Sequence, residues 1–336
     1  MIGFALVTLV LALLASWWGT GRVRRFAVAR ALLDIPNQRS SHSSPTPRGG
    51  GVAIVVVVLA GILAGAAGGW VRDSTAVALV PSGVAVALVS WLDDRRGVPR
   101  RIRLLVHLAA AAWVVYCFGP VEALVPPGPS WLGFLGPVLS VLGIAWVTNL
   151  FNFMDGIDGL AAGEALTVGL AAMLLCWRVD DLEPTWLAAL VAVAAAGFLP
   201  WNWHPARIFL GDVGSVFLGF ILASLAVLTG QRGDLPAAGW LVLLGVFVLD
   251  ATVTLFRRWA RGERWLEAHR SHAYQRAVQA GLTHAQVSGA VMAVNGLLAL
   301  LVWWAVARPH WAAAAYGAAL LLVLALYLRV GRALPM

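Results

Sequence analysis

Residues 285–306 read AQVSGAVMAVNGLLALLVWWAV, a run of 22 residues without a charged side chain. At 1.5 Å per residue, a helix of this length crosses a hydrocarbon core about 30 Å thick. Runs of the same character recur along the chain at 2–19, 50–67, 75–92, 104–119, 131–148, 160–176, 185–200, 215–229, 237–255 and 311–328. The pattern predicts an all-α polytopic membrane protein with about eleven transmembrane helices. Residues 1–336 are expected to form a single integral membrane domain.

The composition excludes an ordinary soluble domain. Hydrophobic residues make up 60% of the chain and charged residues 12%, whereas soluble domains carry roughly 25% charged residues. The chain contains no lysine, so its 24 basic residues are all arginine and the net charge is +8. This balance favours anionic partners such as lipid headgroups, phosphates or nucleotides, and no nucleic-acid partner is expected. The two cysteines, Cys117 and Cys176, are interpreted as inert apolar residues.

The arginines predict the orientation of the chain. No basic residue precedes the first apolar run, and Arg22, Arg24 and Arg25 follow it, which places the N-terminus outside. An odd number of spans then places the C-terminus in the cytoplasm. Twenty of the arginines fall in the segments assigned to the inside, as the positive-inside rule requires. The outer segments hold only four, which are Arg72, Arg178, Arg232 and Arg308.

The unusual polar motifs all fall on the predicted inner segments. They are HSSPTPRGGG (42–51), LDDRR (92–96), NLFNFMDGIDG (149–159), WNWHP with FLGDVGS (201–205 and 209–215) and HRSHAYQ (269–275). An active site built from cytoplasmic loops is therefore expected. A transporter would instead place polar groups near the bilayer midplane, often at broken helices.

Asp93 and Asp94 end the third predicted span and are followed at once by Arg95 and Arg96. One interpretation is an interfacial ion pair that neutralises itself. The other is a pair of oxygen ligands, or a carboxylate base, at the membrane boundary where a lipid phosphate would lie.

A second acidic cluster is more specific. Asn149, Asn152, Asp155 and Asp158 recur at every third residue, so on a helix they would share one broad face. Asp-rich sites of this kind hold magnesium–diphosphate complexes, because magnesium takes few protein carboxylates and completes its coordination with phosphate oxygens and water. The alternative is an ordinary polar loop.

Asp212 lies between two glycines at the start of a span and is a candidate third metal ligand, since Asn202 and the earlier aspartates lie on the same side. Phe209 is interpreted either as a face on which a base stacks or as an interfacial anchor.

The last inner loop carries His269, Arg270 and His272. The two histidines lie three residues apart, but the loop offers no complete tetrahedral set of zinc ligands around them. A contact with a diphosphate is therefore favoured. Asp250, near the inner end of the ninth predicted span, is an intramembrane acid and therefore a functional candidate. A structural ion pair with Arg257 or Arg258 is the favoured interpretation.

Five of these motifs occur in the order of one family and cover nearly the whole chain: PTPRGGG (45–51), DD (93–94), NFMDGIDGL (152–160), FLGDVGS (209–215) and HRSH (269–272). The chain resembles the polyprenyl-phosphate N-acetylhexosamine-1-phosphate transferases, which include phospho-N-acetylmuramoyl-pentapeptide transferase and the O-antigen-initiating transferases. The resemblance implies a multi-pass enzyme of the bacterial inner membrane. Its expected reaction transfers an N-acetylhexosamine 1-phosphate from a UDP-sugar to undecaprenyl phosphate, with Mg²⁺ (or Mn²⁺) as cofactor and release of UMP. The resemblance does not decide whether the protein forms a homodimer.

The resemblance also assigns roles to residues. Asp212 would be a magnesium ligand, and Asp155 and Asp158 would help to bind nucleotide and metal. Asp93 and Asp94 would act at the lipid phosphate. The remaining expected substrate contacts are Arg48, Asn152, Asn202, Phe209, His269, Arg270 and His272, with Asn202 and Phe209 beside the uridine and Arg48 and Arg270 as diphosphate clamps.

The last loop departs from the commoner family pattern of His-x-His-His, because this chain reads His272-Ala-Tyr274-Gln275. The sugar therefore stays open among GlcNAc, FucNAc and QuiNAc. The rival function from another class is a transporter or flippase of a polyprenyl-phosphate-linked lipid. A CDP-alcohol phosphotransferase is disfavoured because the run from Asp158 lacks the arginine of that signature.

Overall fold

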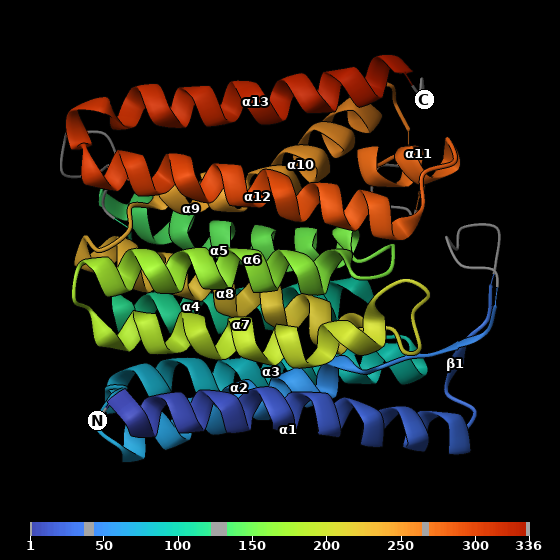
Figure 1. The fold of residues 1–336 in the computed structure, drawn as a ribbon, viewed down its shortest axis with the longest axis horizontal. Coiled ribbons are helices and arrows are strands. Elements are labelled where there is room, and N and C mark those ends of the chain that lie inside the picture. Colours follow the sequence, from blue (N-terminus) through green and yellow to red (C-terminus); the bar gives the residue numbers. More distant parts are fainter. Residues whose placement is uncertain (1, 37–43, 122–132, 264–268, 334–336) are drawn as a thin grey trace.

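The computed structural model describes residues 2–36, 44–121, 133–263 and 269–333. Within these residues the chain is almost entirely helical, which confirms the all-α prediction (Figure 1). The helices are α1 (Ile2–Ala29), α2 (Gly51–Ala67), α3 (Asp73–Arg96), α4 (Arg100–Phe118), α5 (Leu135–Met154), α6 (Leu160–Arg178), α7 (Leu182–Asn202), α8 (Asp212–Arg232), α9 (Ala237–Leu243), α10 (Gly245–Ala260), α11 (Ala273–Gln279), α12 (His284–Ala307) and α13 (Ala312–Ala333). A 3₁₀ turn, η3 (Pro309–Trp311), joins the last two. Two short antiparallel strands, β1 (Leu33–Asp34) and β2 (Thr46–Pro47), complete the described elements.

Nine helices in the described residues are long and apolar enough to cross a membrane, or ten if α9 and α10 together form one broken span. The polytopic prediction is thus confirmed. The expected continuous helix over 237–255 is wrong, because α9 and α10 meet at an angle of 81°. The break falls at Leu244, directly before Gly245, where a residue without a side chain lowers the cost of leaving the helix. The expected span at 50–67 is present as α2, an apolar helix of 17 residues.

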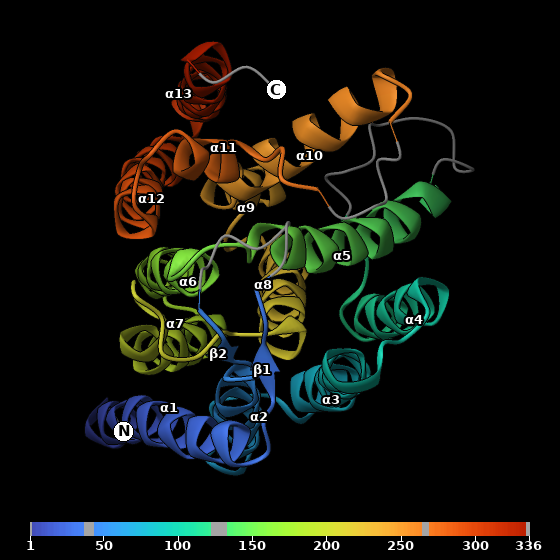
Figure 2. The ribbon, with the colours of Figure 1, turned by 90° about the vertical axis from the view of Figure 1, so that its right-hand side faces the viewer.

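Helix α8 forms the centre of the molecule. It packs against α2, α3, α5 and α7 (Figure 2), and 89% of its most apolar 18-residue window is buried. A helix that is apolar on all sides is stable in this position because every face meets another helix. At the outside of the bundle, α1, α12 and α13 expose large apolar side chains such as Leu11, Leu300 and Leu321, which suits contact with lipid.

The first turns of α2 and α8 cross very closely. A Cβ atom at Gly51 would lie 2.3 Å from the Cα atom of Gly214. Only glycine fits at such a crossing, and the two helix starts are therefore held at one level.

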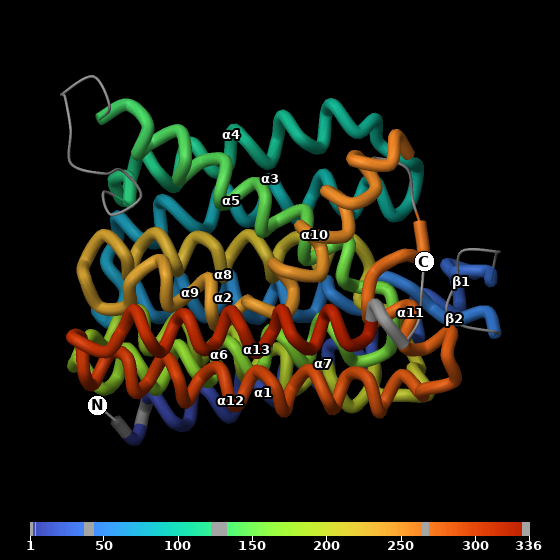
Figure 3. Tube along the Cα trace, turned by 90° about the horizontal axis from the view of Figure 1, so that it is seen from above, coloured from blue at the N-terminus to red at the C-terminus, as the bar shows by residue number. Residues whose placement is uncertain are grey.

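The polar motifs gather at one end of the bundle. The helices lie roughly side by side along the long axis, with β1, β2 and α11 at the end opposite to the N-terminus (Figures 1 and 3). The C-terminal end of α13 lies at the same end as α11. The motifs are far apart in sequence but share this end because each follows or precedes a helix that crosses the bundle.

Candidate functional site

Two loops pair through their backbones at the start of α8. The amide of Phe209 donates to the carbonyl of Pro47 at 2.8 Å, and the amides of Gly50 and Gly51 donate to the carbonyls of Phe209 and Leu210, each at 2.9 Å. This pairing satisfies backbone groups of both loops. It also places Arg48 of the first loop beside Asp212, the first residue of α8.

Asp94 caps the N-terminus of α8 from the end of α3. Its two carboxylate oxygens accept hydrogen bonds from the amides of Asp212 and Val213, each at 3.1 Å. Amides of a first helical turn have no partner within the helix, so a carboxylate is well placed there. Arg48 forms an ion pair with the Asp94 carboxylate and lies 3.3 Å from that of Asp212.

Gly211 makes this arrangement possible, because its φ is +76° and a Cβ atom there would lie 2.8 Å from Asp94 Oδ2.

Asp93 is held in a similar way by the start of α4. One of its oxygens accepts from the amide of Val98 at 2.6 Å, and Arg103 forms an ion pair with the other. The same guanidinium nitrogen of Arg103 lies 3.4 Å from Asp212 Oδ2. Arg103 is a site residue that the motif analysis missed, although it lies on the same inner segment as Asp93.

The interpretation of Asp93 and Asp94 as an ion pair with their neighbours in sequence is wrong. Their partners are Arg103 and Arg48, while Arg95 lies over the ring of Trp91 at 4.1 Å. Adjacent residues on a helix point in different directions, so the two aspartates reach different loops.

Asp155 follows the last residue of α5 and completes a group of carboxylates with Asp93, Asp94 and Asp212, named here the acidic centre. Burial, followed by the nearby carboxylates of Asp212 and Asp94, raises the pKa of Asp155 to about 8. Asn152 donates to the hydroxyl of Ser215 at 3.1 Å and thereby joins the end of α5 to the first turn of α8. The structure thus brings together residues that are more than 100 positions apart in sequence.

The ligand chemistry of the acidic centre suits a magnesium ion, and magnesium binding here stays a prediction. Its four carboxylates are faced by two arginines, Arg48 and Arg103, so negative charge remains for a cation. Carboxylate oxygens are the ligands that magnesium prefers. Burial is the main cause of the raised pKa of Asp155, and the carboxylates of Asp212 and Asp94 add to it. Asp212 and Asp155 are the residues that would hold the ion.

This arrangement predicts a pH-dependent affinity for magnesium. Since Asp155 keeps its proton in the folded protein up to a pH near 8 but loses it near pH 4 when unfolded, the free energy of unfolding without a divalent cation should fall as the pH rises between these values. Magnesium needs the ionised carboxylate, so it should raise the unfolding temperature in detergent more at about pH 8.5 than at about pH 6. Asp155→Asn should flatten this difference. An equal magnesium effect at both pH values would contradict the assignment.

Asp158 belongs to a second polar group, which neighbours the acidic centre because its carboxylate adds to the raised pKa of Asp155. Helix α5 ends at Met154, so the broad face expected to carry Asn149 to Asp158 is interrupted before Asp155. Asp158 Oδ2 lies 2.7 Å from Nδ1 of His204 and 3.2 Å from Nδ1 of His284. Burial opposes ionisation, but hydrogen bonds from the two histidines lower the pKa of Asp158 below its ordinary value. The expectation that Asp155 and Asp158 share one helix face is therefore wrong, because residues 155–159 lie between α5 and α6 and are not helical.

These three side chains offer one carboxylate oxygen and two ring nitrogens within 4.8 Å of one another. Imidazole ligands suit transition metals more than magnesium. Sequence analysis did not identify His204 or His284, which come from separate segments and show no ligand spacing.

Asn202 and Phe209 belong to the loop that joins α7 to α8. The amide side chain of Asn202 is buried, accepts from the amide of Gly159 at 2.9 Å and donates to the carbonyl of Ile208 at 3.0 Å. It therefore holds the 155–159 turn against this loop. Phe209 is half-buried beside Pro47. A contact of either residue with uridine stays a prediction.

The last loop is anchored by Asp250 of α10. Its carboxylate accepts from the amides of Ala273 and Tyr274 at 2.9 and 3.3 Å, and its Oδ1 lies 3.4 Å from Nδ1 of His272. The expected pairing of Asp250 with Arg257 or Arg258 is wrong. Arg257 lies over the ring of Tyr327, and Arg258 pairs with Glu263. The Asp250 carboxylate instead accepts hydrogen bonds from amides at the start of α11, which have no partner within that helix.

Tyr274 connects this loop to the acidic centre. Its hydroxyl donates to the carbonyl of Phe153 at 3.0 Å, and a Cβ atom at Gly156 would lie 2.2 Å from that hydroxyl. His272 stacks on the ring of Tyr274. Arg270 accepts a hydrogen bond from Gln279 through its carbonyl. Within the described residues, His272 thus contacts Asp250, Tyr274, His269 and Gln275.

His269 is neutral at physiological pH, because burial and the nearby His272 and Arg258 lower its pKa to about 4. Roles of His269, Arg270 and His272 at the diphosphate stay predictions.

Residues 76–230 match the family described as glycosyl transferase family 4. A probable undecaprenyl-phosphate N-acetylglucosaminyl 1-phosphate transferase of Bacillus subtilis is 30% identical, over 83% of this chain and 78% of that protein. A decaprenyl-phosphate N-acetylglucosaminephosphotransferase of Mycolicibacterium smegmatis is 30% identical, over 83% and 76%. A phospho-N-acetylmuramoyl-pentapeptide-transferase of a Synechococcus strain is 32% identical, over 93% of both chains. The matched region contains the acidic centre.

Proposed function

The chain belongs to glycosyl transferase family 4 as a membrane-embedded sugar-phosphate transferase, and from this premise we propose its specific reaction. It transfers an N-acetylhexosamine 1-phosphate from a UDP-sugar to undecaprenyl phosphate and releases UMP. The product begins a cell-envelope glycan such as O-antigen. The observation that carries this proposal is the acidic centre, in which four carboxylates and two arginines from α3, α4, α5, α8 and the loop before α2 meet at one end of the bundle.

The chemistry requires two anions to approach each other. A phosphate monoester has a second pKa of about 6, so the lipid phosphate is largely dianionic at neutral pH and needs no strong base. Arg48 and Arg103 offer guanidinium groups beside the acidic centre, where charge-assisted hydrogen bonds to phosphate oxygens would lower the repulsion. When bound, magnesium would supply further charge neutralisation at the diphosphate.

The two aspartates of α3 have positioning roles in this proposal. Asp94 accepts two amide hydrogen bonds and faces Arg48, and Asp93 accepts one amide and faces Arg103. Each of these carboxylates is already bound by groups of the protein, so in this proposal it holds its arginine beside the acidic centre. Direct attack of the lipid phosphate on the β-phosphorus, with UMP as the leaving group, is favoured over a covalent aspartyl-phosphate intermediate.

The proposal is tested by incubating the purified protein with undecaprenyl phosphate, magnesium and one UDP-sugar at a time, and by measuring UMP. The panel contains the UDP-linked forms of GlcNAc, FucNAc and QuiNAc, since Tyr274 stands in the loop where the commoner family pattern has histidine. UMP release that depends on both the lipid phosphate and one of these sugars is the expected result. Absence of UMP with every sugar, together with movement of a polyprenyl-phosphate-linked lipid across vesicles, would favour the flippase alternative.

The proposed site faces the cytoplasm of a bacterial inner membrane, and the arginine distribution supports this orientation. In a variant with Cys117 and Cys176 replaced by alanine, a cysteine introduced at Ser74 should react with an impermeant thiol reagent added to intact cells. A cysteine at Thr283 should be protected until the membrane is opened. Both positions are exposed at the ends of helices, so access to reagent decides the result. Labelling of Thr283 but not Ser74 in intact cells would reverse the orientation.

A further inference from the structure

Tyr274 contacts the chain on both sides of Asp155. Its hydroxyl donates to the carbonyl of Phe153, two residues before the aspartate, at 3.0 Å. The same hydroxyl packs against Gly156, the residue after the aspartate, so closely that a Cβ atom there would lie 2.2 Å from it. The carbonyl of Phe153 belongs to the last turn of α5, where carbonyl groups lack partners within the helix. The hydroxyl therefore binds the end of α5 at the point where Asp155 follows the helix.

The tyrosine side chain is itself held in place. It is buried, and its ring stacks on that of His272 with ring centroids 5.7 Å apart. The backbone amide of Tyr274 donates to the carboxylate of Asp250 at 3.3 Å. Asp250 belongs to α10, which packs against α5 (Figure 2). Since both the backbone and the ring of Tyr274 have fixed partners, its hydroxyl has little freedom to move with the segment that it contacts.

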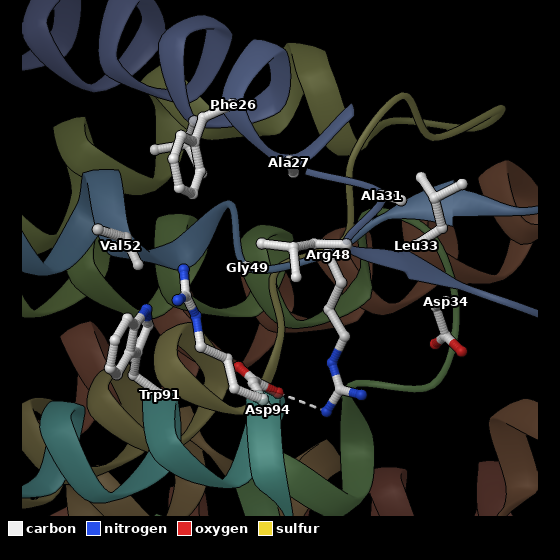
Figure 4. Close-up of a pocket in the computed structure, with 13 residues that line it drawn as sticks. Phe26, Ala27, Ala31, Leu33, Asp34, Arg48, Gly49, Val52, Trp91 and Asp94 are labelled. Carbon is white, nitrogen blue, oxygen red and sulfur yellow. Dashed lines mark ion pairs between the residues drawn. The ribbon is translucent and has the colours of Figure 1, made fainter. Parts of the chain in front are cut away.

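Asp155 depends on contacts of this kind more than its neighbours in the acidic centre do. Asp212 is the first residue of α8, so the helix itself fixes its backbone. Asp94 lies within α3, and Figure 4 shows the ion pair that joins its carboxylate to Arg48. Asp155 instead follows the last residue of α5 and lies in a segment that is not helical. Its position is therefore set by the groups that pack against this segment, and Tyr274 supplies two of these contacts.

We propose that Tyr274 is a positioning residue for magnesium binding, which rests on the proposed function. It holds the 153–156 segment so that the carboxylate of Asp155 stays beside that of Asp212. In this assignment Tyr274 touches neither the metal nor a substrate. Loss of its hydroxyl leaves the carbonyl of Phe153 without this partner and lets the segment move. The affinity for magnesium then falls, whereas the chemical step at saturating magnesium is preserved.

The first test uses Tyr274→Phe and needs no turnover. Hydrogen–deuterium exchange of the purified protein in detergent is followed in peptides that cover residues 153–160, while magnesium is titrated. Magnesium should slow exchange of this segment in the wild-type protein. Without magnesium, Tyr274→Phe should exchange about three- to ten-fold faster, the range for loss of one hydrogen bond. Half-maximal protection should require about three- to ten-fold more magnesium, for the same reason.

Three results of this experiment would overturn the proposal. They are unchanged exchange in Tyr274→Phe, an unchanged magnesium requirement in that variant, and absence of magnesium protection in the wild-type protein. The matched control is Tyr116→Phe, which removes the same hydroxyl from an α4 side chain that is 81% exposed. It should behave as the wild type does. A change of equal size in Tyr116→Phe would show a general loosening of the protein and would also count against the proposal.

A double variant tests the contact with Gly156. Gly156→Ala alone places a methyl group against the tyrosine hydroxyl and should raise the magnesium requirement. Tyr274→Phe removes the nearest atom, so the next contact of that methyl group is with Cζ of the ring at 3.0 Å. The two substitutions should therefore have a combined effect smaller than the product of their separate effects. Multiplicative effects would show that the two residues act independently and would refute the contact.

The second measurement is UMP release as a function of magnesium concentration. The magnesium concentration for half-maximal activity of Tyr274→Phe should rise by the same factor as in the exchange experiment. Its kcat at saturating magnesium should stay within about two-fold of the wild-type value. A lower kcat at every magnesium concentration, with no shift in the requirement, would reduce Tyr274 to a structural role. If the wild-type protein releases no UMP with any sugar, the proposed function fails, and the exchange experiment still decides the role of Tyr274.

Discussion

Asp212→Asn is expected to lower magnesium-dependent UMP release by about two orders of magnitude or more, the range for loss of one group that stabilises developing charge. Asparagine keeps the shape and one oxygen but removes the negative charge. Asp212 lies between Arg48 and Arg103, at 3.3 and 3.4 Å, and beside Asp155, so no neighbouring side chain occupies the same position. The loss should appear mainly in kcat and in the magnesium concentration needed for half-maximal activity.

The fold should survive this substitution. Without the Asp212 charge, Arg48 keeps its ion pair with Asp94 and Arg103 keeps its ion pair with Asp93. The amide of Asp212, which Asp94 binds, is unaffected by the change of side chain. The unfolding temperature in detergent should therefore change little. Asp73→Asn, at an exposed position at the other end of α3, is the matched control and should be silent. Wild-type turnover of Asp212→Asn with unchanged magnesium dependence would refute its assignment as a metal ligand.

Arg48→Ala should have the second largest effect. Its guanidinium contacts the carboxylates of Asp94 and Asp212. The substitution therefore removes the positive charge that balances these two neighbouring carboxylates. A hydrogen bond to a charged group contributes about 1.5–3 kcal/mol, which corresponds to a loss in kcat/KM of about ten- to a hundred-fold for one contact with phosphate. Arg48→Lys should recover only part of the activity, because an ammonium group lacks the planar fork that reaches two oxygens at once.

The control for Arg48 is Arg96→Ala, which removes an exposed arginine at the end of α3 on the same side of the molecule. It should retain kcat/KM within about two-fold, since exposed surface charges contribute little. Comparison of the two variants separates a general loss of positive charge from loss of the contact at the acidic centre. Equal losses in both variants would show that Arg48 acts only through its contribution to the positive electrostatic potential of the protein surface.

The pattern of residues along the chain was sufficient to predict the all-helical class and the position of nearly every helix. A span in a membrane must satisfy its backbone within itself, so its hydropathy can be evaluated one segment at a time. The break between α9 and α10 was not predicted, because both lie in one continuous apolar run over 237–249 and packing decides where the helix is interrupted. The motifs identified Asp93, Asp94, Asp155 and Asp212 before any fold was known, because several acidic side chains at the ends of apolar runs have no role in a core.

Partners were decided by the tertiary structure alone. Most inner loops carry arginines, so composition could not show that Asp94 meets Arg48 and that Asp93 meets Arg103. Backbone pairing of the 47–51 and 209–210 segments and the turn from α3 into α4 determine these partners. The same holds for Asp158, which meets His204 and His284 from the segment between α5 and α6. It also holds for Asp250, whose carboxylate binds amides at the start of α11. Hydropathy is a property of each segment, whereas an ion pair depends on where two segments meet.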